Sequence, residues 1–231
     1  MLNVKDLTLH YGQSQILYGL DILAKAGEVT AVMGTNGVGK TSLLKAIAGR
    51  HPYSGGSVSV DGQDLKHPTA FQAARAGIAY VPQGREVFPL MTVEENLEAG
   101  FACLPKDQHS IPDKIYDLFP VLKEMRGRRG GDLSGGQQQQ LAIARALITK
   151  PRVLLLDEPT EGIQPNIIKQ IGAVISQLRE EGEIAIVLVE QYFDFAFDLA
   201  DRFTALSRGS VILDDVKANV ERERLLRAVS I

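Results

Sequence analysis

Apolar and polar residues alternate in short runs along the first third of the chain, a pattern typical of strands with one buried face. Because these runs are short and close together, they favour a small antiparallel layer at one edge of the fold. A helix is predicted over 39–48, and the dipeptide Asp61-Gly62 predicts a hairpin turn. The predicted strands of this part are Val4–Leu9, Ile16–Ala24, Val29–Met33, Ser57–Leu65 (folded about that turn) and Ile78–Val81.

The pattern becomes helical after residue 81. Thr92 and Glu95 have the spacing of a capping box, which predicts a helix that begins there and reaches Ala99. Further helices are predicted near Asp113–Phe119 and over Ser134–Thr149. These segments indicate a helical lobe over residues 84–150, inserted between two parts of the core.

The last third alternates strands and helices. The runs VLLLD and IAIVLV lack polar alternation, which is typical of parallel strands covered by helices on both faces. The predicted strands are Val153–Asp157, Ile184–Val189, Phe203–Leu206 and Val211–Leu213, with helices from Pro165 to about Glu181 and up to about Asp201, and a turn at Arg208-Gly209. The fold class is therefore α/β. A core of residues 1–83 and 151–231 has a parallel sheet, an N-terminal antiparallel layer and an inserted helical lobe, all in one domain.

Composition narrows the choice of partners. The chain has 25 Lys and Arg against 28 Asp and Glu, which gives a net charge of −3. It therefore lacks the excess of positive charge that would indicate nucleic acid as a binding partner. One cysteine, Cys103, excludes an internal disulfide, and the four histidines lack the spacing of metal ligands. The start of the chain lacks the apolar stretch of a secretion signal, and the apolar runs are only as long as strands. Any membrane role is therefore expected to be peripheral.

The segment GTNGVGKT matches the phosphate-loop pattern GxxxxGK[ST], and it stands between a predicted strand and a predicted helix. In that context backbone N–H groups and a helix N-terminus face phosphates, which disfavours the alternative of a glycine-rich structural turn. We expect Lys40 to reach the β- and γ-phosphates of a nucleotide and the Thr41 hydroxyl to bind Mg²⁺. The candidate nucleotide-binding residues are Gly34, Thr35, Asn36, Gly37, Val38, Gly39, Lys40, Thr41 and Ser42.

Two acidic residues, Asp157 and Glu158, follow the apolar strand VLLL. They stand at its carboxyl end, which is where open α/β sheets bind ligands. Because successive strand residues point to opposite sides, we expect Asp157 to face Mg²⁺ and Glu158 to face the water that attacks the γ-phosphate. The alternative, a pair of helix-capping acids before Pro159, is weaker beside a phosphate loop.

The segment LSGGQ, followed by QQQLAIARAL, resembles the signature of the ATP-binding cassette family, the ATPase subunits of ABC transporters. The resemblance covers essentially the whole chain and implies a P-loop NTPase (RecA-like) core. It also implies that Ser134 and the backbone of Gly135 and Gly136 contact the γ-phosphate held by a second subunit, and a helix N-terminus is a suitable anion site. Gln137, the last residue of the motif, is a further candidate for nucleotide binding. The alternative is a serine N-cap followed by a flexible turn.

The same resemblance assigns further residues. Gln83 is similar to the Q-loop glutamine, which contacts Mg²⁺ and the attacking water and joins the core to the lobe. Tyr11 resembles the aromatic that stacks on adenine, with Tyr18 as the alternative. Gln191 stands where the family usually has a switch histidine, and an amide can donate to a γ-phosphate oxygen but cannot become cationic. Gln164 stands where an aspartate usually crosses the dimer interface, so both changes bear on coupling between subunits.

These departures and the segment GREVFPLMTVEENL resemble the second ATPase of branched-chain amino acid importers, and LLLDEPTEGIQPNII resembles their urea-importing members. The resemblance implies a peripheral ATPase at the cytoplasmic face of the inner (plasma) membrane, with ATP and Mg²⁺. It implies a second cassette, either a copy or a sister chain, and permease subunits, with a solute-binding protein as an indirect partner.

Three apolar residues of the lobe, Phe88, Leu90 and Phe101, are candidate contacts with a permease. Packing in the core is the alternative for each of them. Two other functions stay open for the chain as a whole. One is a soluble cassette ATPase or clamp not linked to transport, although such relatives typically carry two cassettes or a long coiled coil. The other is a clamp that binds ATP without turnover, which the acidic pair and Lys40 disfavour.

Overall fold

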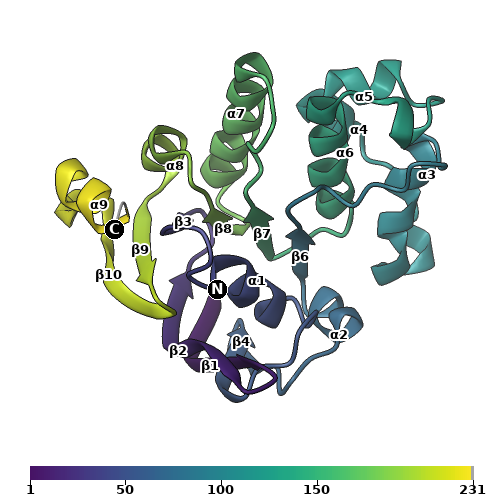
Figure 1. Ribbon diagram of the computed structural model, residues 1–231. Helices are drawn as coiled ribbons and strands as arrows, with labels where there is room; N and C mark the ends of the chain where they lie inside the picture. The colour runs from purple at the N-terminus through teal and green to yellow at the C-terminus, as the bar shows by residue number, and fades with distance from the viewer. Residues whose placement is uncertain (230–231) are drawn as a thin grey trace.

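A computed structural model describes residues 1–229, which fold around two β-sheets (Figure 1). The strands of the larger sheet are Val29–Met33 (β3), Ile78–Val81 (β6), Val153–Asp157 (β7), Ala185–Val189 (β8), Arg202–Ser207 (β9) and Ser210–Val216 (β10). The strands of the smaller sheet are Leu2–Tyr11 (β1), Ser14–Ala24 (β2), Gly55–Val60 (β4) and Gln63–Asp64 (β5). The orders are β10-β9-β3-β8-β7-β6 and β2-β1-β4-β5.

The larger sheet is parallel except at one edge. β3, β6, β7, β8 and β9 run in the same direction, and β10 pairs antiparallel with β9. The carboxyl ends of the parallel strands therefore meet at one edge, where open α/β sheets bind ligands. The smaller sheet is antiparallel throughout, as the alternating pattern predicts.

Helices connect most of the strands. They are Lys40–Ile47 (α1), Ala70–Arg75 (α2), Val93–Glu98 (α3), Asp113–Leu118 (α4), Pro120–Glu124 (α5), Gly135–Ile148 (α6), Pro165–Glu181 (α7), Phe193–Leu199 (α8) and Arg222–Val229 (α9). Short 3-10 turns cover residues 99–103, 106–108, 130–132 and 217–219. Figure 1 shows α3, α4, α5 and α6 gathered at one end of the molecule, between β6 and β7 in the chain. This helical lobe and the two sheets agree with the predicted fold class.

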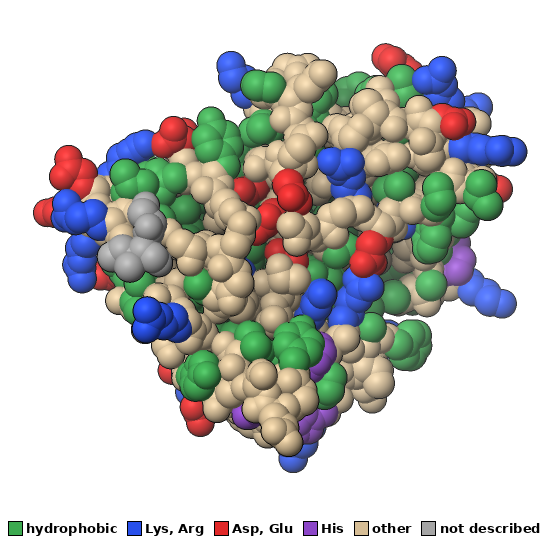
Figure 2. All heavy atoms as spheres, in the orientation of Figure 1, with side chains coloured by type: hydrophobic (Ala, Val, Ile, Leu, Met, Phe, Trp, Pro, Cys, Tyr) green, Lys and Arg blue, Asp and Glu red, His purple; other side chains and the backbone are tan. Residues whose placement is uncertain are grey.

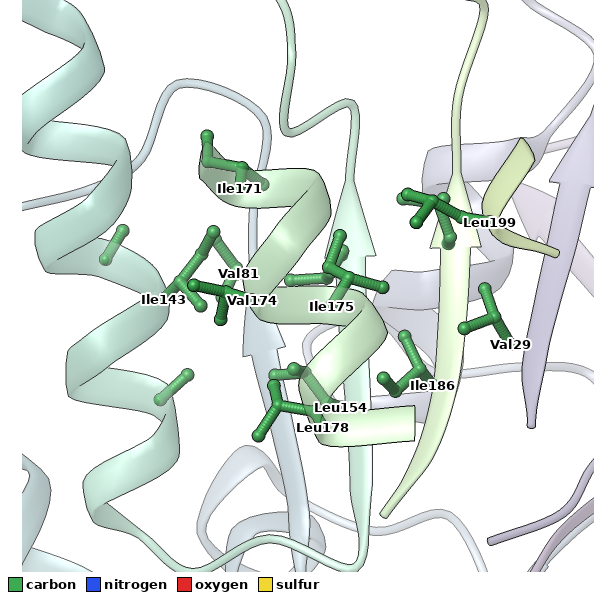
Figure 3. Packing of buried hydrophobic residues seen from close by; sticks show 14 of the residues in the cluster. Val29, Val81, Ile143, Leu154, Ile171, Val174, Ile175, Leu178, Ile186 and Leu199 are labelled. Atoms are coloured by element: carbon green, nitrogen blue, oxygen red, sulfur yellow. The ribbon is translucent and has the colours of Figure 1, made fainter. Parts of the chain in front are cut away.

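The core lies on both faces of the larger sheet. On β7, Leu155 faces α1 and the smaller sheet, whereas Leu154 and Leu156 face the layer of α6, α7 and α8. Apolar residues of α7 recur at the three- and four-residue spacing that buries one helix face. Figure 3 shows this face against α6 and the sheet, and its buried residues are Ile171, Val174, Ile175 and Leu178. Because the strands are covered on both sides, they are apolar without alternation.

Several elements differ from the sequence prediction. The helices α2, α5 and α9 were not predicted, and β1 and β10 extend beyond the predicted strands. The predicted turn at Asp61-Gly62 within Ser57–Leu65 is confirmed, because both residues take positive φ angles, of 50° and 81°, between β4 and β5. Within residues 1–229, none of the helices combines the length and the apolar character needed to cross a bilayer.

Candidate functional site

The edge formed by the carboxyl ends of the parallel strands contains a hollow of about 450 Å³. In the view of Figure 2, acidic side chains gather near the middle of the molecule and basic side chains lie next to them. The hollow brings together ten of the predicted site residues with two others, Ile16 and Glu161. Its lining is Tyr11, Ile16, Asn36, Gly37, Gly39, Lys40, Thr41, Ser42, Gln83, Glu158, Glu161 and Gln191. Thr35 and Val38 line an adjoining hollow that also includes Asn36 and Gly37.

The phosphate loop between β3 and α1 requires glycine at two positions. Gly34 has a φ of 148°, and a Cβ there would stand 2.4 Å from the carbonyl oxygen of Leu206. Gly39 has a φ of 106°, and a Cβ there would stand 2.5 Å from Leu17 Cδ2. Larger residues therefore cannot follow this path without a shift of the backbone. Lys40 and the next two residues form the first turn of α1, so the helix N-terminus faces the hollow.

Lys40 is the buried cation of the site. Its Nζ donates to the carbonyl oxygens of Gly34 at 2.8 Å and Thr35 at 3.0 Å, and it lies 3.9 Å from Glu158 Oε1. Burial lowers the pKa of Lys40, and the nearby carboxylates of Glu158 and Asp157 oppose that change. The ammonium therefore depends on negative groups around it, and a phosphate would supply more of them.

Asp157 ends β7 beneath the phosphate loop. The Thr41 hydroxyl donates to its Oδ1 at 3.1 Å, and the Tyr80 hydroxyl donates to its Oδ2 at 2.9 Å. Burial raises the pKa of Asp157, while these two hydrogen bonds lower it. Both oxygens are thus held in fixed directions, and Oδ1 and the Thr41 hydroxyl form a pair of hard oxygen donors.

Glu158 stands immediately after β7 in a left-handed conformation, with a φ of 48°. Its Oε1 accepts from the Gln191 amide at 2.5 Å, and its Oε2 accepts from the Gln83 amide at 3.2 Å. The Gln83 amide also donates to Glu161 at 3.0 Å. The structure therefore joins the three predicted catalytic residues directly, from the loops after β6, β7 and β8.

Two carboxylates of this region were not predicted from the sequence. Glu161 lines the hollow, and Glu190 is buried behind it. Glu190 accepts from the backbone N–H and hydroxyl of Thr160, and from the backbone N–H groups of Gln191 and Tyr192. Burial raises the pKa of Glu190, and these hydrogen bonds oppose that change. Glu190 therefore connects the loop after Glu158 to the loop of Gln191. The sequence pattern that could have identified Glu190 is a carboxylate directly after the apolar run IAIVLV.

Tyr11 lies at the rim of the hollow, whereas Tyr18 does not line it. The Tyr11 ring is exposed and meets the ring of His51 edge-on, with centroids 4.3 Å apart. The Tyr18 hydroxyl donates to the Gln15 carbonyl on the exposed side of β2. Of the two candidates for a base-stacking aromatic, Tyr11 is thus the one beside the phosphate loop.

The glycine motif at the start of α6 is absent from the lining of the hollow. Ser134 is the N-cap of α6, and its hydroxyl accepts from the Gln137 N–H at 3.4 Å. The Gln137 side chain accepts from the Ser134 N–H at 2.9 Å, which completes a capping box. The first backbone N–H groups of the helix, at Gly135 and Gly136, thus belong to a helix N-terminus outside the lining of the chain's own hollow.

Comparison with known proteins identifies the family. The model of the family described as ABC transporter matches residues 17–161. The chain belongs to the ABC transporter family. It is 42% identical to the high-affinity branched-chain amino acid transport ATP-binding protein BraG of Pseudomonas aeruginosa, over 94% of each chain. It is 38% identical to the probable branched-chain amino acid transport ATP-binding protein LivF of Archaeoglobus fulgidus, over 91% of this chain and 90% of that one.

Solved cassettes share the whole fold. A nucleotide-free ATP-binding cassette from an ABC transporter superposes with a TM-score of 0.85 and 25% identity, over 100% of this chain and 95% of that one. A dimeric cassette in a post-hydrolysis state, bound to ADP and Pi, superposes with a TM-score of 0.82 and 25% identity, over 94% and 99%. The chain is therefore an ATP-binding cassette with the fold of an ABC-type ATPase, and it hydrolyses ATP.

Proposed function

We propose that this cassette is the ATP-binding subunit of an ABC importer, in which ATP hydrolysis at a dimer interface drives the uptake of a small polar solute through separate permease subunits. The observation that carries the proposal is the convergence of the phosphate loop with Gln83, Glu158 and Gln191 in one hollow. The similarity to BraG and LivF supports the link to transport.

Within the hollow each side chain has a proposed role. Glu158 orients or deprotonates the water that attacks the γ-phosphate, and its two amide partners hold it in place. Lys40 and the N–H groups of the phosphate loop stabilise negative charge on the phosphates. Gln191 is a neutral donor in this scheme, so its contact with Glu158 does not depend on a titrating ring.

The residues of the site fit Mg²⁺. Thr41 Oγ1 and Asp157 Oδ1 lie 3.1 Å apart, and a small hard cation prefers such oxygen donors, with phosphates supplying others. We assign Thr41 and Asp157 to hold it, with Gln83 as a further contact from the edge of the hollow. When bound, Mg²⁺ neutralises charge that develops on the phosphates.

The N-terminus of α6 supports a dimer. Ser134, Gly135 and Gly136 do not line the hollow of their own chain, so a γ-phosphate that they contact belongs to a second cassette. The similarity to a dimeric cassette bound to ADP and Pi supports this arrangement. The partner is a second copy or a sister chain, and the neutral Gln191 and Gln164 favour the sister, whose site would carry the family's usual residues.

The helical lobe, assigned to residues 84–150, carries the proposed permease contact. A groove of about 270 Å³ runs between β6 and the lobe, and its lining includes Tyr80, Arg85, Phe88 and Arg145. Of the three apolar candidates, Phe88 lines this groove, Leu90 is 80% exposed, and Phe101 stacks on His109. An apolar groove with basic residues suits a short helix of a permease, which would hold the cassette at the cytoplasmic face of the membrane.

The solute belongs to the branched-chain amino acid type or to urea. The relatives BraG and LivF favour an amino acid, whereas the segment from residue 154 to 168 resembles the urea-importing members. Uptake of labelled leucine and labelled urea in a deletion strain distinguishes them, with the wild-type chain and Lys40→Ala as the complementing pair. Restored uptake of one solute by the wild-type chain alone identifies it.

One assay tests the whole proposal. ATP hydrolysis is measured for the purified chain with and without its permease subunits and sister cassette, in proteoliposomes. An importer subunit hydrolyses ATP faster in the assembly and loses that activity in Lys40→Ala. A soluble ATPase would be fully active alone, and a clamp without turnover would bind ATP and release no phosphate in either sample. Either outcome would overturn the proposal.

A further inference from the structure

We propose that Tyr80 is a positioning residue that fixes the Asp157 carboxylate for divalent-cation binding. This inference rests on the proposed function, because it concerns the same nucleotide site. Tyr80 is half-buried on β6, lies outside the lining of the nucleotide hollow, and is not among the residues assigned to the reaction. Its hydroxyl nevertheless donates to Asp157 Oδ2 at 2.9 Å.

The strand register explains how the two side chains meet. β6 and β7 are parallel, and Tyr80 stands opposite Leu155. Side chains two residues apart on a strand share a face, so Asp157 lies on the same face as Leu155. A diagonal neighbour in a sheet is about 7–8 Å away, a distance that a tyrosine ring spans. The contact is therefore built into the pairing of β7 with the edge strand β6 and does not depend on a loop.

The Tyr80 ring is also held from its other side. The Arg50 guanidinium lies over the ring, 5.6 Å from its centroid. Arg50 in turn donates to both carboxylate oxygens of Glu86, at 2.8 Å and 3.2 Å. Glu86 follows Gln83 by three residues, so this bidentate pair anchors the Tyr80 ring to the same loop. The ring thus has a defined orientation, with its hydroxyl directed at Asp157.

The Tyr80 hydroxyl makes the two carboxylate oxygens of Asp157 different in their contacts. Oδ2 is occupied by Tyr80, and Oδ1 faces the Thr41 hydroxyl, 3.1 Å away. Without the Tyr80 hydroxyl, Oδ2 loses its partner, and the carboxylate can turn about its last torsion angle and lose the orientation that pairs Oδ1 with Thr41. Partners that orient metal ligands in this way typically change metal affinity about tenfold to a hundredfold when they are removed.

The test compares nucleotide affinity with and without a metal ion. Binding of ATPγS to the purified chain is measured by titration calorimetry, once in excess EDTA and once in excess Mn²⁺. The ratio of the two affinities reports the metal-dependent gain alone. Tyr80→Phe should leave the affinity in EDTA unchanged and reduce the gain about tenfold or more.

A matched control separates this effect from a general loss of stability. Tyr53→Phe removes another buried tyrosine hydroxyl, one that donates to the Leu65 carbonyl at 2.9 Å, and it should leave the gain unchanged. Arg50→Gln keeps the Tyr80 hydroxyl but removes the guanidinium over its ring, and it should reduce the gain by a smaller factor.

The outcomes separate this inference from the proposed function. If the wild-type chain shows no metal-dependent gain, the metal site itself is wrong, and the inference falls with it. If the wild-type chain shows the gain and Tyr80→Phe keeps it in full, only the role of Tyr80 is overturned. Should Tyr80→Phe not fold, Arg50→Gln decides, and an unchanged gain in that variant overturns the inference.

Discussion

Replacing Glu158 with glutamine tests which carboxylate of the hollow activates water. Glu158 and Glu161 both line the hollow, and both accept a hydrogen bond from the Gln83 amide. Only Glu158 also contacts Gln191 and lies 3.9 Å from the Lys40 ammonium. Glu158→Gln keeps the size and shape of the side chain and removes its ability to accept a proton.

The structure sets the size of the expected effect. The two amides that donate to Glu158 can each rotate to present an oxygen, so the substituted side chain can keep both contacts. The substitution removes proton transfer to this carboxylate, which typically raises the reaction rate about 10²–10⁴-fold. At 1.36 kcal/mol for each factor of ten, the barrier rises by about 3–5 kcal/mol. ATP affinity should be kept, because Lys40 and the phosphate loop are unchanged.

The assay is steady-state phosphate release by the complete transporter, together with ATP affinity measured on the purified chain. The matched control is Glu161→Gln, which alters an exposed carboxylate in the same hollow and should change turnover by less than about threefold. Turnover in Glu158→Gln within tenfold of the wild type would refute the assignment. A large loss in Glu161→Gln instead would transfer the role to that residue.

Three other changes test the fold and the loop. Gly34→Ala places a Cβ 2.4 Å from a backbone oxygen and should weaken ATP binding, measured by titration calorimetry, more than tenfold. The control Gly37→Ala places a Cβ with no other atom within 4 Å and should weaken binding far less. Leu155→Ala empties a fully buried position and should lower the free energy of unfolding in urea by about 2–5 kcal/mol. Asp61→Asn should cost no more than about 1 kcal/mol at pH 7. The N-terminal ammonium and Arg152 both donate hydrogen bonds to Asp61 and lower its pKa. The loss of stability in Asp61→Asn is therefore complete at pH values above 3.8, the ordinary pKa of the group, and disappears as the pH falls through the lower pKa of the folded state.

Elements with clear end signals were predictable from the sequence. The helix Pro165–Glu181 has the predicted bounds, because proline stands at its first position and Gly182 ends it in a left-handed conformation. The helix α2 was missed although Thr69 and Gln72 form a capping box, because six residues are too few for a periodic pattern. The helix α9 was missed because its sequence is strongly polar and Leu225 is its only fully buried residue.

The composition of the site was more predictable than its contacts. Loops after parallel strands meet at one edge, so the convergence of Gln83, Glu158 and Gln191 follows from the order of strands. The hydrogen bond between Gln191 and Glu158 depends on side-chain torsions across two loops, which no sequence pattern specifies. The capping role of the Gln137 side chain on α6 was not predicted, although its spacing from Ser134 indicates a capping box, and its contact with nucleotide stays a prediction.

Tyr80 connects the two surfaces on which the proposed function depends. Its ring lines the groove assigned to a permease, and its hydroxyl bonds to the carboxylate assigned to Mg²⁺. Arg85 makes a similar connection, because it lines the groove and donates to the Glu161 carbonyl at 3.2 Å. A partner in the groove can act on the nucleotide site through these two side chains only if it contacts them differently in two states. Coupling between transport and hydrolysis along this route would then require two arrangements of the Tyr80 and Arg85 side chains, each with its own hydrogen bonds to the site.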